Sequence, residues 1–170
     1  MMQEFLLNNI ETYISLMSKI QEGIIIHKED TSIVYVNPSA CKILGLSENQ
    51  LLGKTAMNHE WYFVNEDNEA MSLDSYPVNI LFNTEEDISQ MLIGIHSSQE
   101  DLKWVELNAS ITRNEKNERI ALMIFSDVTA RKNAFDDAEF FKKLVDIVDT
   151  GITVSDPSSE KAYLMNKLVK

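Results

Sequence analysis

The first 21 residues carry apolar side chains at the spacing of a helix. Leu6, Ile10, Tyr13 and Met17 follow one another at intervals of four, three and four residues, which places them on one face of an α-helix. Neither Gly nor Pro interrupts the pattern. It predicts an amphipathic helix over residues 1–21. The apolar face of this helix needs a partner, which is either the rest of the domain or a second chain.

Apolar runs of strand length dominate residues 22–129. Residues 23–27 and 33–36 flank a polar turn, and three longer runs follow at residues 88–95, 102–111 and 120–126. Short polar segments, "HSSQED" and "RNEKNE", separate the last three runs. Connections this short predict hairpins, and hairpins require antiparallel pairing.

Signals for short helices lie between the two groups of strands. Asn37 and Pro38 can open a helix, because Asn caps free N–H groups and Pro fits the first turn. Similar signals predict one short helix after Ser47 and another that begins at Pro77. Residues 54–75, which are acidic and aromatic, are predicted to be irregular.

Residues 130–148 return to a helical pattern. Ala134, Ala138, Phe141, Val145 and Val148 alternate in steps of four and three, which is the spacing of the seam in a two-stranded coiled coil. The pattern is short, so it fits a helix packed on its own domain equally well. Together the elements predict an α+β fold. A five-stranded antiparallel sheet carries short helices on one face and lies between an N-terminal amphipathic helix and a C-terminal exit helix.

The end of the chain repeats the pattern of the first predicted hairpin. "TGITVSDPSSEKAYLMN" matches "EGIIIHKEDTSIVYVN" in its order of Gly, strand, polar turn, strand and Asn. Both segments follow an amphipathic helix. The repeat predicts four parts: a helix at 1–21, a domain at 22–129, a connecting helix at 130–148, and the truncated start of a second domain of the same kind at 149–170.

The charge of the chain narrows the classes of partner. Its 170 residues include 15 Lys and Arg against 27 Asp and Glu, a net charge of −12, and the whole excess of acid falls in residues 1–129. An acidic body repels phosphate groups and anionic lipid, so we expect neither nucleic-acid binding nor direct membrane binding. Cys41 is the single cysteine, which excludes an intrachain disulfide. No secretory leader or membrane-spanning apolar run is evident, so we expect a cytoplasmic protein.

Three stretches together resemble the PAS family: "EGIIIHKEDTSIVYVNPSACKILGLSENQLLGK", "LKWVELNASI" and "ALMIFSDVTARK". The last is similar to the Asp-(Ile/Val)-Thr signature that closes many PAS domains and leads into a connecting helix. A fourth stretch, "EWYFVNEDNEAMSLDSYPV", resembles a PAS variant with a Trp before an acidic turn. Asn68 stands where that variant usually has Gly, and Asn also accepts a positive φ. The resemblance covers residues 21–132.

The resemblance implies a module that senses a signal in a cleft between sheet and helices. It also implies transmission to an output such as a sensor histidine kinase or a diguanylate cyclase. In this cleft we expect a site for a small apolar molecule, because ligand pockets are mainly apolar. Its expected lining is Trp61, Phe63, Leu81, Met91, Ile93, Leu107 and Met123.

Dimerisation through the flanking helices is the second property that the resemblance implies. We expect a homodimer with an interface at Leu6, Ile10, Tyr13 and Met17. Asp127 and Thr129, at the end of the last strand, either pass a signal to the exit helix or only cap that helix. The alternative function is a ligand-free module that brings two chains together.

Catalysis and known cofactors are not expected. The sequence shows no nucleophile–base pair and no spacing typical of metal ligands, so we predict neither an enzyme nor a metal site. Flavin-binding relatives place a reactive cysteine on a later helix, whereas Cys41 lies on the first and is expected to be a buried structural thiol. Haem-binding relatives use a histidine on the late helix, where this sequence has none. His27, His59 and His96 are therefore expected at the surface or in loops, and the cofactor stays unknown.

Overall fold

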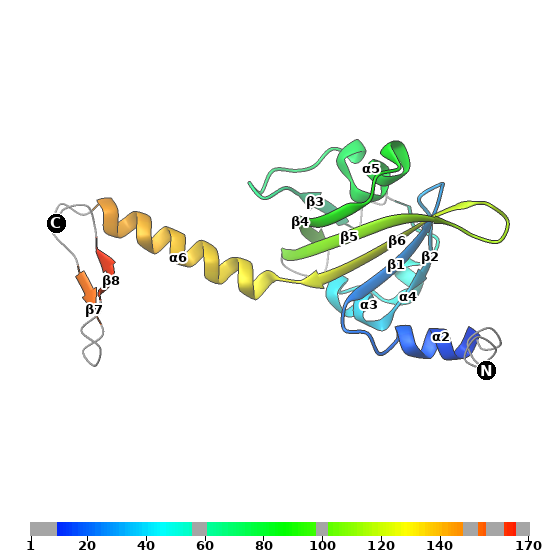
Figure 1. The fold of residues 1–170 in the computed structure, drawn as a ribbon, viewed down its shortest axis with the longest axis horizontal. Helices are drawn as coiled ribbons and strands as arrows, with labels where there is room; N and C mark the ends of the chain where they lie inside the picture. Colours follow the sequence, from blue (N-terminus) through cyan, green and yellow to red (C-terminus); the bar gives the residue numbers. More distant parts are fainter. Residues whose placement is uncertain (1–9, 56–60, 98–101, 148–152, 156–161, 166–170) are drawn as a thin grey trace. The chain divides into compact units, whose positions relative to one another are not determined.

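The computed structural model describes residues 10–55, 61–97, 102–147, 153–155 and 162–165. The chain divides into two compact units, residues 1–129 and 130–170. The first unit contains, in order, α2 (Ile10–Met17), β1 (Gly23–Lys28), β2 (Ile33–Val36), α3 (Pro38–Leu44), α4 (Glu48–Leu51), β3 (Trp61–Val64), the 3₁₀ turn η1 (Leu73–Ser75), α5 (Pro77–Thr84), β4 (Ile88–Ser97), β5 (Lys103–Arg113) and β6 (Arg119–Asp127) (Figure 1). Helix α6 (Thr129–Ile147) begins at the end of this unit, and β7 (Thr153–Ser155) and β8 (Ala162–Met165) follow it.

One antiparallel sheet forms the frame of the first unit. Its strand order is β2-β1-β6-β5-β4-β3, so the first hairpin joins the long β4–β5–β6 meander through β1 and β6 (Figure 1). Ile25 lies opposite Met123, and Leu107 lies opposite Phe125. Because paired residues project to the same side of a sheet, these four side chains share one face, and all four are buried.

The predicted α+β fold is confirmed, but the predicted number of strands is wrong. The described sheet has six strands, because Trp61–Val64 forms β3 in the segment expected to be irregular and pairs with β4 from Trp61–Ser97 to Val64–Gly94. Trp61 and Phe63 point to the core side, while Tyr62 is half exposed. This strand is four residues long and is followed by an acidic turn, so its alternation is too brief to stand out in the sequence.

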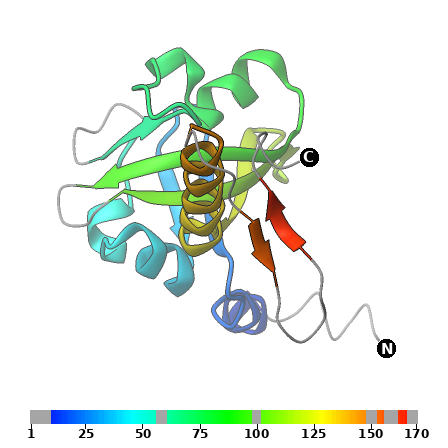
Figure 2. The same ribbon diagram turned by 90° about the vertical axis from the view of Figure 1, so that its left-hand side faces the viewer.

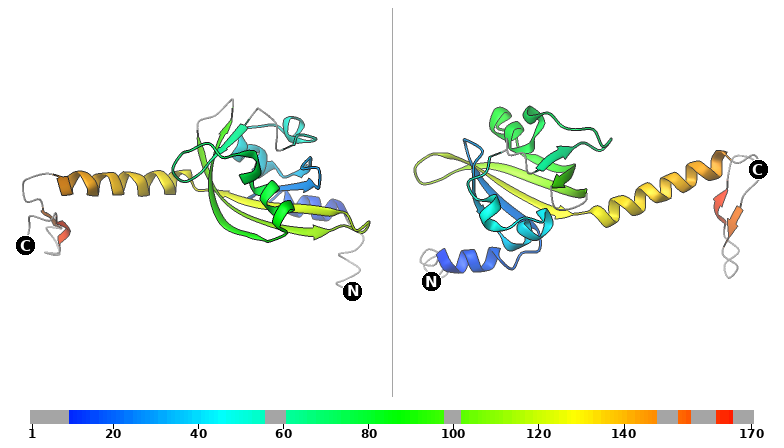
Figure 3. Two further views of the ribbon diagram at one scale, coloured as in Figure 1. Left: turned by 90° about the horizontal axis from the view of Figure 1, so that it is seen from above. Right: turned by 180° about the vertical axis from the view of Figure 1, so that it is seen from behind.

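Short helices cover the buried face of the sheet. In the right-hand view of Figure 3, α3 and α4, drawn in cyan, lie in front of the strands. Helix α3 begins after Asn37, whose side chain accepts a hydrogen bond from the Ala40 N–H, and ends at Gly45, which has the left-handed φ of 67°. Asn68 has a φ of 62°, so the Asn that replaces Gly in the acidic turn adopts the backbone expected of it. Helix packing on one face closes the core, as predicted.

Helix α2 is shorter than the sequence predicts at its C-terminal end. It ends at Met17 rather than near Gln21, because the backbone turns at Ser18 to Ile20 and the Met17 carbonyl accepts a hydrogen bond from the Asn37 side chain. Leu6 lies outside the described residues. Tyr13 and Ile14 are exposed, with 41% and 50% of their surface accessible.

The second unit holds the exit helix and a separate hairpin. Helix α6 ends at Ile147, close to the predicted end, and Val148 lies outside the described residues. β7 and β8 pair antiparallel with Val154 opposite Leu164, and they run side by side in Figure 2. A hairpin is what the internal repeat predicts here, but its origin as the start of a second domain stays a prediction.

Candidate functional site

An apolar cavity lies between the buried face of the sheet and the short helices. Its volume is about 70 Å³. All six strands of the sheet contribute to its wall, as do α5 and the α3–α4 segment. The lining residues are Ile25, His27, Ile33, Leu44, Leu46, Leu51, Thr55, Trp61, Phe63, Pro77, Val78, Ile93, Ile95, Val105, Leu107, Met123 and Phe125. None of them is charged at neutral pH if His27 is neutral, so the cavity suits an uncharged molecule.

Five of the seven residues predicted to bind a ligand line this cavity: Trp61, Phe63, Ile93, Leu107 and Met123. Leu81 is fully buried and Met91 packs against the core, but neither lines the cavity. For Leu81 and Met91 the predicted place in the cavity wall is therefore not what the structure shows. Sequence reasoning also missed the wall formed by β1 and the α3–α4 segment. The alternation of Ile25 and His27 on β1 could have revealed part of that wall.

His27 is the polar group that the sequence analysis placed wrongly. It was expected at the surface or in a loop, yet it lies on β1 and only 6% of its surface is accessible. The reason is strand geometry: His27 pairs with Ala121 and shares the inward face with Ile25. Its Nδ1 lies 2.7 Å from the Thr31 carbonyl oxygen. Burial lowers the pKa of His27 below its ordinary value, and the hydrogen bond to Thr31 opposes this shift only in part.

The end of β6 is tied to β5 where the exit helix begins. The Thr129 hydroxyl oxygen accepts a hydrogen bond from the Trp104 N–H at 3.0 Å, and the hydroxyl lies 2.6 Å from a carboxylate oxygen of Asp127. The same carboxylate accepts from the Thr129 N–H, and the Val128 N–H donates to the Trp104 carbonyl. The structure thus brings the two predicted transmission residues together with Trp104, which the sequence analysis did not single out. Both a helix cap and a mechanical link are compatible with these bonds.

Asn37 holds the end of α2 to the domain. Its side chain makes four hydrogen bonds: Oδ1 accepts from the N–H groups of Ile24 and Ala40, and Nδ2 donates to the carbonyls of Met17 and Glu22. Asn37 is completely buried, so its amide has exchanged water for these partners. The sequence predicted only its helix-capping role.

The predicted dimer residues lie on or before α2. Ile10 is the first residue of the helix, Tyr13 is exposed and Met17 is half-buried. The part of the chain that the structure describes therefore contains three of the four predicted interface residues on one helix, and Leu6 lies outside it.

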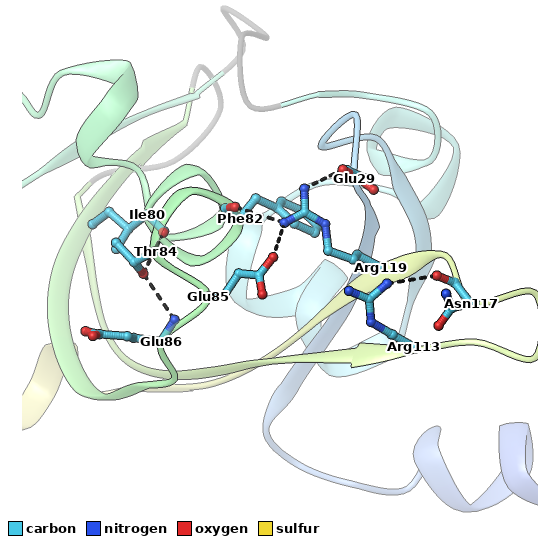
Figure 4. A network of polar contacts seen from close by, with 9 residues as sticks. All are labelled: Glu29, Ile80, Phe82, Thr84, Glu85, Glu86, Arg113, Asn117 and Arg119. Atoms are coloured by element: carbon cyan, nitrogen blue, oxygen red, sulfur yellow. Dashed lines mark hydrogen bonds and ion pairs between the residues drawn. The ribbon is translucent and has the colours of Figure 1, made fainter.

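Arg119 joins three distant segments at one end of the domain. Figure 4 shows its guanidinium between Glu29, in the β1–β2 turn, and Glu85, at the end of α5. It also donates to the Phe82 carbonyl and stacks over the Phe82 ring, 5.7 Å from the ring centre. The bond to Arg119 lowers the pKa of Glu29 below its usual range. All three anchors lie outside the cavity wall, so the role of this cluster is to hold the hairpin turn to α5.

No other described group suggests redox or metal chemistry. Cys41 is half-buried, and burial raises the pKa of its thiol, which fits an inert structural cysteine. No group of three or more His, Cys, Asp or Glu side chains that could hold a metal ion occurs among the described residues. Within the same residues, no helix combines the length and the apolar character needed to cross a bilayer.

Comparisons with known proteins agree with this architecture. The sequence profile of the PAS fold matches residues 11–128. The structure is similar to the PAS domain of an HTR-like protein from Haloarcula marismortui, at 16% identity and a TM-score of 0.56, over 74% of this chain and 96% of that one. It is similar to a PAS domain from a two-component sensor histidine kinase, at 14% identity and a TM-score of 0.53, with the same coverage. It also resembles the PAS domain of the fruit-fly ELK potassium channel, at 14% identity and a TM-score of 0.54, over 72% of this chain and 98% of that one. Identities this low speak for the fold alone. A search of curated protein sequences finds no significant match.

Proposed function

The chain belongs to the PAS fold family, and we propose that it is a sensory module that binds a small apolar molecule in the cavity between sheet and helices. The observation that carries this proposal is the cavity itself, which is enclosed by residues of the hydrophobic core. Its apolar wall favours an uncharged ligand. The proposed role is binding and signalling rather than catalysis, because no hydrogen-bonded pair of nucleophile and base occurs among the described lining residues.

The hydrogen bonds at the end of β6 support a route from the cavity to the exit helix. Val105 lines the cavity, and the next residue toward the strand start, Trp104, is bonded to Val128 and Thr129. A ligand that displaces Val105 also displaces the Trp104 backbone. In this proposal Asp127 and Thr129 convert that displacement into a movement of the first turn of α6.

Xenon tests the cavity, because apolar cavities of this kind take up xenon. Methyl NMR spectra of the full chain under xenon pressure should show shifts for cavity-lining methyl groups such as those of Leu107, with a smaller shift of the Thr129 amide. Ile93→Phe fills the cavity and should abolish the shifts. Leu92→Phe is the matched control, since Leu92 is the adjacent residue and pairs with Glu106 on the other side of the sheet. Absence of xenon shifts in the unmodified chain, or equal shifts in Ile93→Phe, would refute the proposal.

The output of the module is proposed from its likeness to sensory domains. A two-component sensor histidine kinase contains one of the similar PAS domains, which favours a kinase-type or cyclase-type output in signal transduction. A cytoplasmic location stays a prediction of the sequence.

A second candidate function, assembly of two chains, rests on the exposed face of α6. Phe140, Phe141, Leu144 and Ile147 have 63%, 60%, 44% and 76% of their surface accessible. Phe140, Leu144 and Ile147 are spaced by four and three residues, so they form a stripe along the helix. Of the residues that the sequence placed in the seam, Val145 is buried, whereas Phe141 is exposed. The dimer stripe is therefore proposed at Phe140, Leu144 and Ile147 rather than along the predicted seam.

Sedimentation velocity over a range of concentrations tests the assembly. Replacing Phe140 and Leu144 with Ser should convert dimers to monomers. Replacing Lys142 and Asp146, exposed residues away from this stripe on the same helix, with Ser is the control and should leave the dimer intact. A monomer in the unmodified chain, or a dimer that survives the Phe140 and Leu144 changes, would contradict the proposal.

A further inference from the structure

The wall of the cavity includes a buried histidine, His27, and only one of its two ring nitrogens has a hydrogen-bond partner among the described residues. His27, Thr55 and the indole N–H of Trp61 are the polar side-chain groups of the lining residues, and His27 is the one among them that can only accept at its unpaired nitrogen. The His27 ring is bonded at Nδ1 to the Thr31 carbonyl. For Nε2, no hydrogen-bond partner is found among the described residues.

The bond to Thr31 fixes which nitrogen carries the proton. A carbonyl oxygen can only accept, so Nδ1 must be the N–H donor. Burial lowers the pKa of His27, so the ring is neutral at neutral pH. In a neutral imidazole with its proton on Nδ1, Nε2 is an acceptor with a free lone pair. The ring therefore presents an acceptor in surroundings that are otherwise apolar.

Water and ions are poor occupants of such a site. A buried water needs two to four polar partners to be stable, and the side chains of the lining offer few polar groups beyond His27, Thr55 and the Trp61 indole N–H. A charged ligand would leave its charge unpaired in an apolar wall. A metal ion would need further ligands beside Nε2, and the described residues hold no suitable cluster. The size of the site restricts the occupant as well: its 70 Å³ is about half of the roughly 150 Å³ that take up benzene in an engineered cavity.

We propose that the cavity takes a small uncharged molecule that donates one hydrogen bond to Nε2 of His27 and buries the rest of its surface against the apolar wall. Short-chain alcohols are the simplest members of this class. This assignment rests on the proposed function, since it requires that the cavity binds a ligand at all. It adds that the ligand is selected by a donor group and not by apolar surface alone.

A pair of probes with nearly the same shape tests the assignment. 2-Propanol carries a hydroxyl donor, whereas acetone carries only an acceptor. Titrations followed by methyl NMR of the full chain should give a dissociation constant for 2-propanol that is about 3- to 10-fold lower than for acetone, the value of one hydrogen bond. In His27→Leu the preference should disappear. In Thr55→Val, which removes the hydroxyl of the wall, it should persist.

A direct measurement on the unmodified chain accompanies the variants. The ¹⁵N resonance of His27 Nε2 should move toward the value of a hydrogen-bonded nitrogen when 2-propanol is added, while Nδ1 stays nearly unchanged, and acetone should leave both in place. This readout does not depend on the folding of a variant.

The outcomes separate this inference from the proposed function. If acetone binds as well as 2-propanol, or if the preference is lost in Thr55→Val and kept in His27→Leu, the role of His27 is refuted while ligand binding stands. If neither probe nor xenon perturbs the cavity residues, the ligand-binding function fails together with the assignment.

Discussion

Replacing Asn37 with Ala should weaken the domain more than any surface change, because one side chain satisfies four backbone groups. Oδ1 accepts from Ile24 N at 2.9 Å and from Ala40 N at 2.8 Å, and both bonds are buried. Nδ2 donates to Glu22 O at 2.9 Å and to Met17 O at 3.2 Å, and these bonds are only partly buried. The Ala variant leaves all four groups without their partner.

The magnitude follows from the burial of each group. A buried N–H without a partner costs about 1–3 kcal/mol, and a typical hydrogen bond contributes about 0.5–1.5 kcal/mol. The N–H groups of Ile24 and Ala40 therefore account for about 2–6 kcal/mol, and the carbonyls of Met17 and Glu22, which water can reach, add about 1 kcal/mol. We expect a loss of about 3–7 kcal/mol, a large part of the ~5–15 kcal/mol by which domains are stable.

Urea unfolding monitored by circular dichroism measures this loss. Asn83→Ala is the matched control, since Asn83 is exposed on α5 and its replacement should change the stability by no more than about 0.5 kcal/mol. Hydrogen exchange should also show faster exchange of the Ile24 and Ala40 amides in Asn37→Ala. A loss below about 1 kcal/mol, or unchanged exchange at both amides, would show that the amide network contributes little.

Three further changes test other parts of the structure. Burial lowers the pKa of His27 below its ordinary value of 6.5, so the imidazole of the unfolded chain is protonated at a higher pH than that of the folded chain. The contribution of the neutral ring to the free energy of unfolding is therefore complete above about pH 6.5, and it falls at lower pH by up to about 1.4 kcal/mol per pH unit. Urea unfolding from about pH 8 to about pH 5 measures the fall, and His27→Leu should reduce the slope; an unchanged slope contradicts the burial argument. A Cβ on Gly94 would lie 2.5 Å from a methyl group of Val64, so Gly94→Ala should lower the free energy of unfolding by about 1–3 kcal/mol, measured by thermal unfolding. This loss should be smaller when Val64 is also replaced with Ala, and strictly additive losses would argue against a clash. Arg119→Met should let the pKa of Glu29 return toward its ordinary value in a ¹³C carboxyl titration, whereas Asp30, held by Ser32, should keep its lowered pKa; a Glu29 that does not respond contradicts the ion pair.

Much of the fold could be predicted because its signals are local. The alternation in 102–111 and the Asn37-Pro38 pair specify β5 and the start of α3 from neighbouring residues alone. Strand β3 could not be predicted in this way. Its four residues become a strand through pairing with β4, and that pairing depends on contacts between segments about 30 residues apart.

The candidate site was harder to predict than the fold, because a cavity depends on how distant elements pack. Trp61, Phe63 and Ile93 were recognisable as core residues with a suitable size. Whether a core residue borders the cavity depends on packing that no local pattern records, and Leu81 was wrongly included in the lining for this reason. His27 was missed because a histidine at the end of a predicted strand was expected at the surface or in a loop, although the period of β1 directs it inward.

The two flanking helices are attached to the same sheet at positions next to the cavity wall. Ile25 lines the cavity, and the N–H of the preceding Ile24 is bonded to Asn37, which also holds the end of α2. Val105 lines the cavity, and the N–H of the preceding Trp104 is bonded to Thr129, where α6 begins. A backbone that moves with an inward side chain carries its neighbour with it, since consecutive strand residues share a peptide plane. We therefore expect an occupant of the cavity to act on both helix anchors together, so that a change at Asn37 alters the response of α6 to a ligand as well as the stability of the domain.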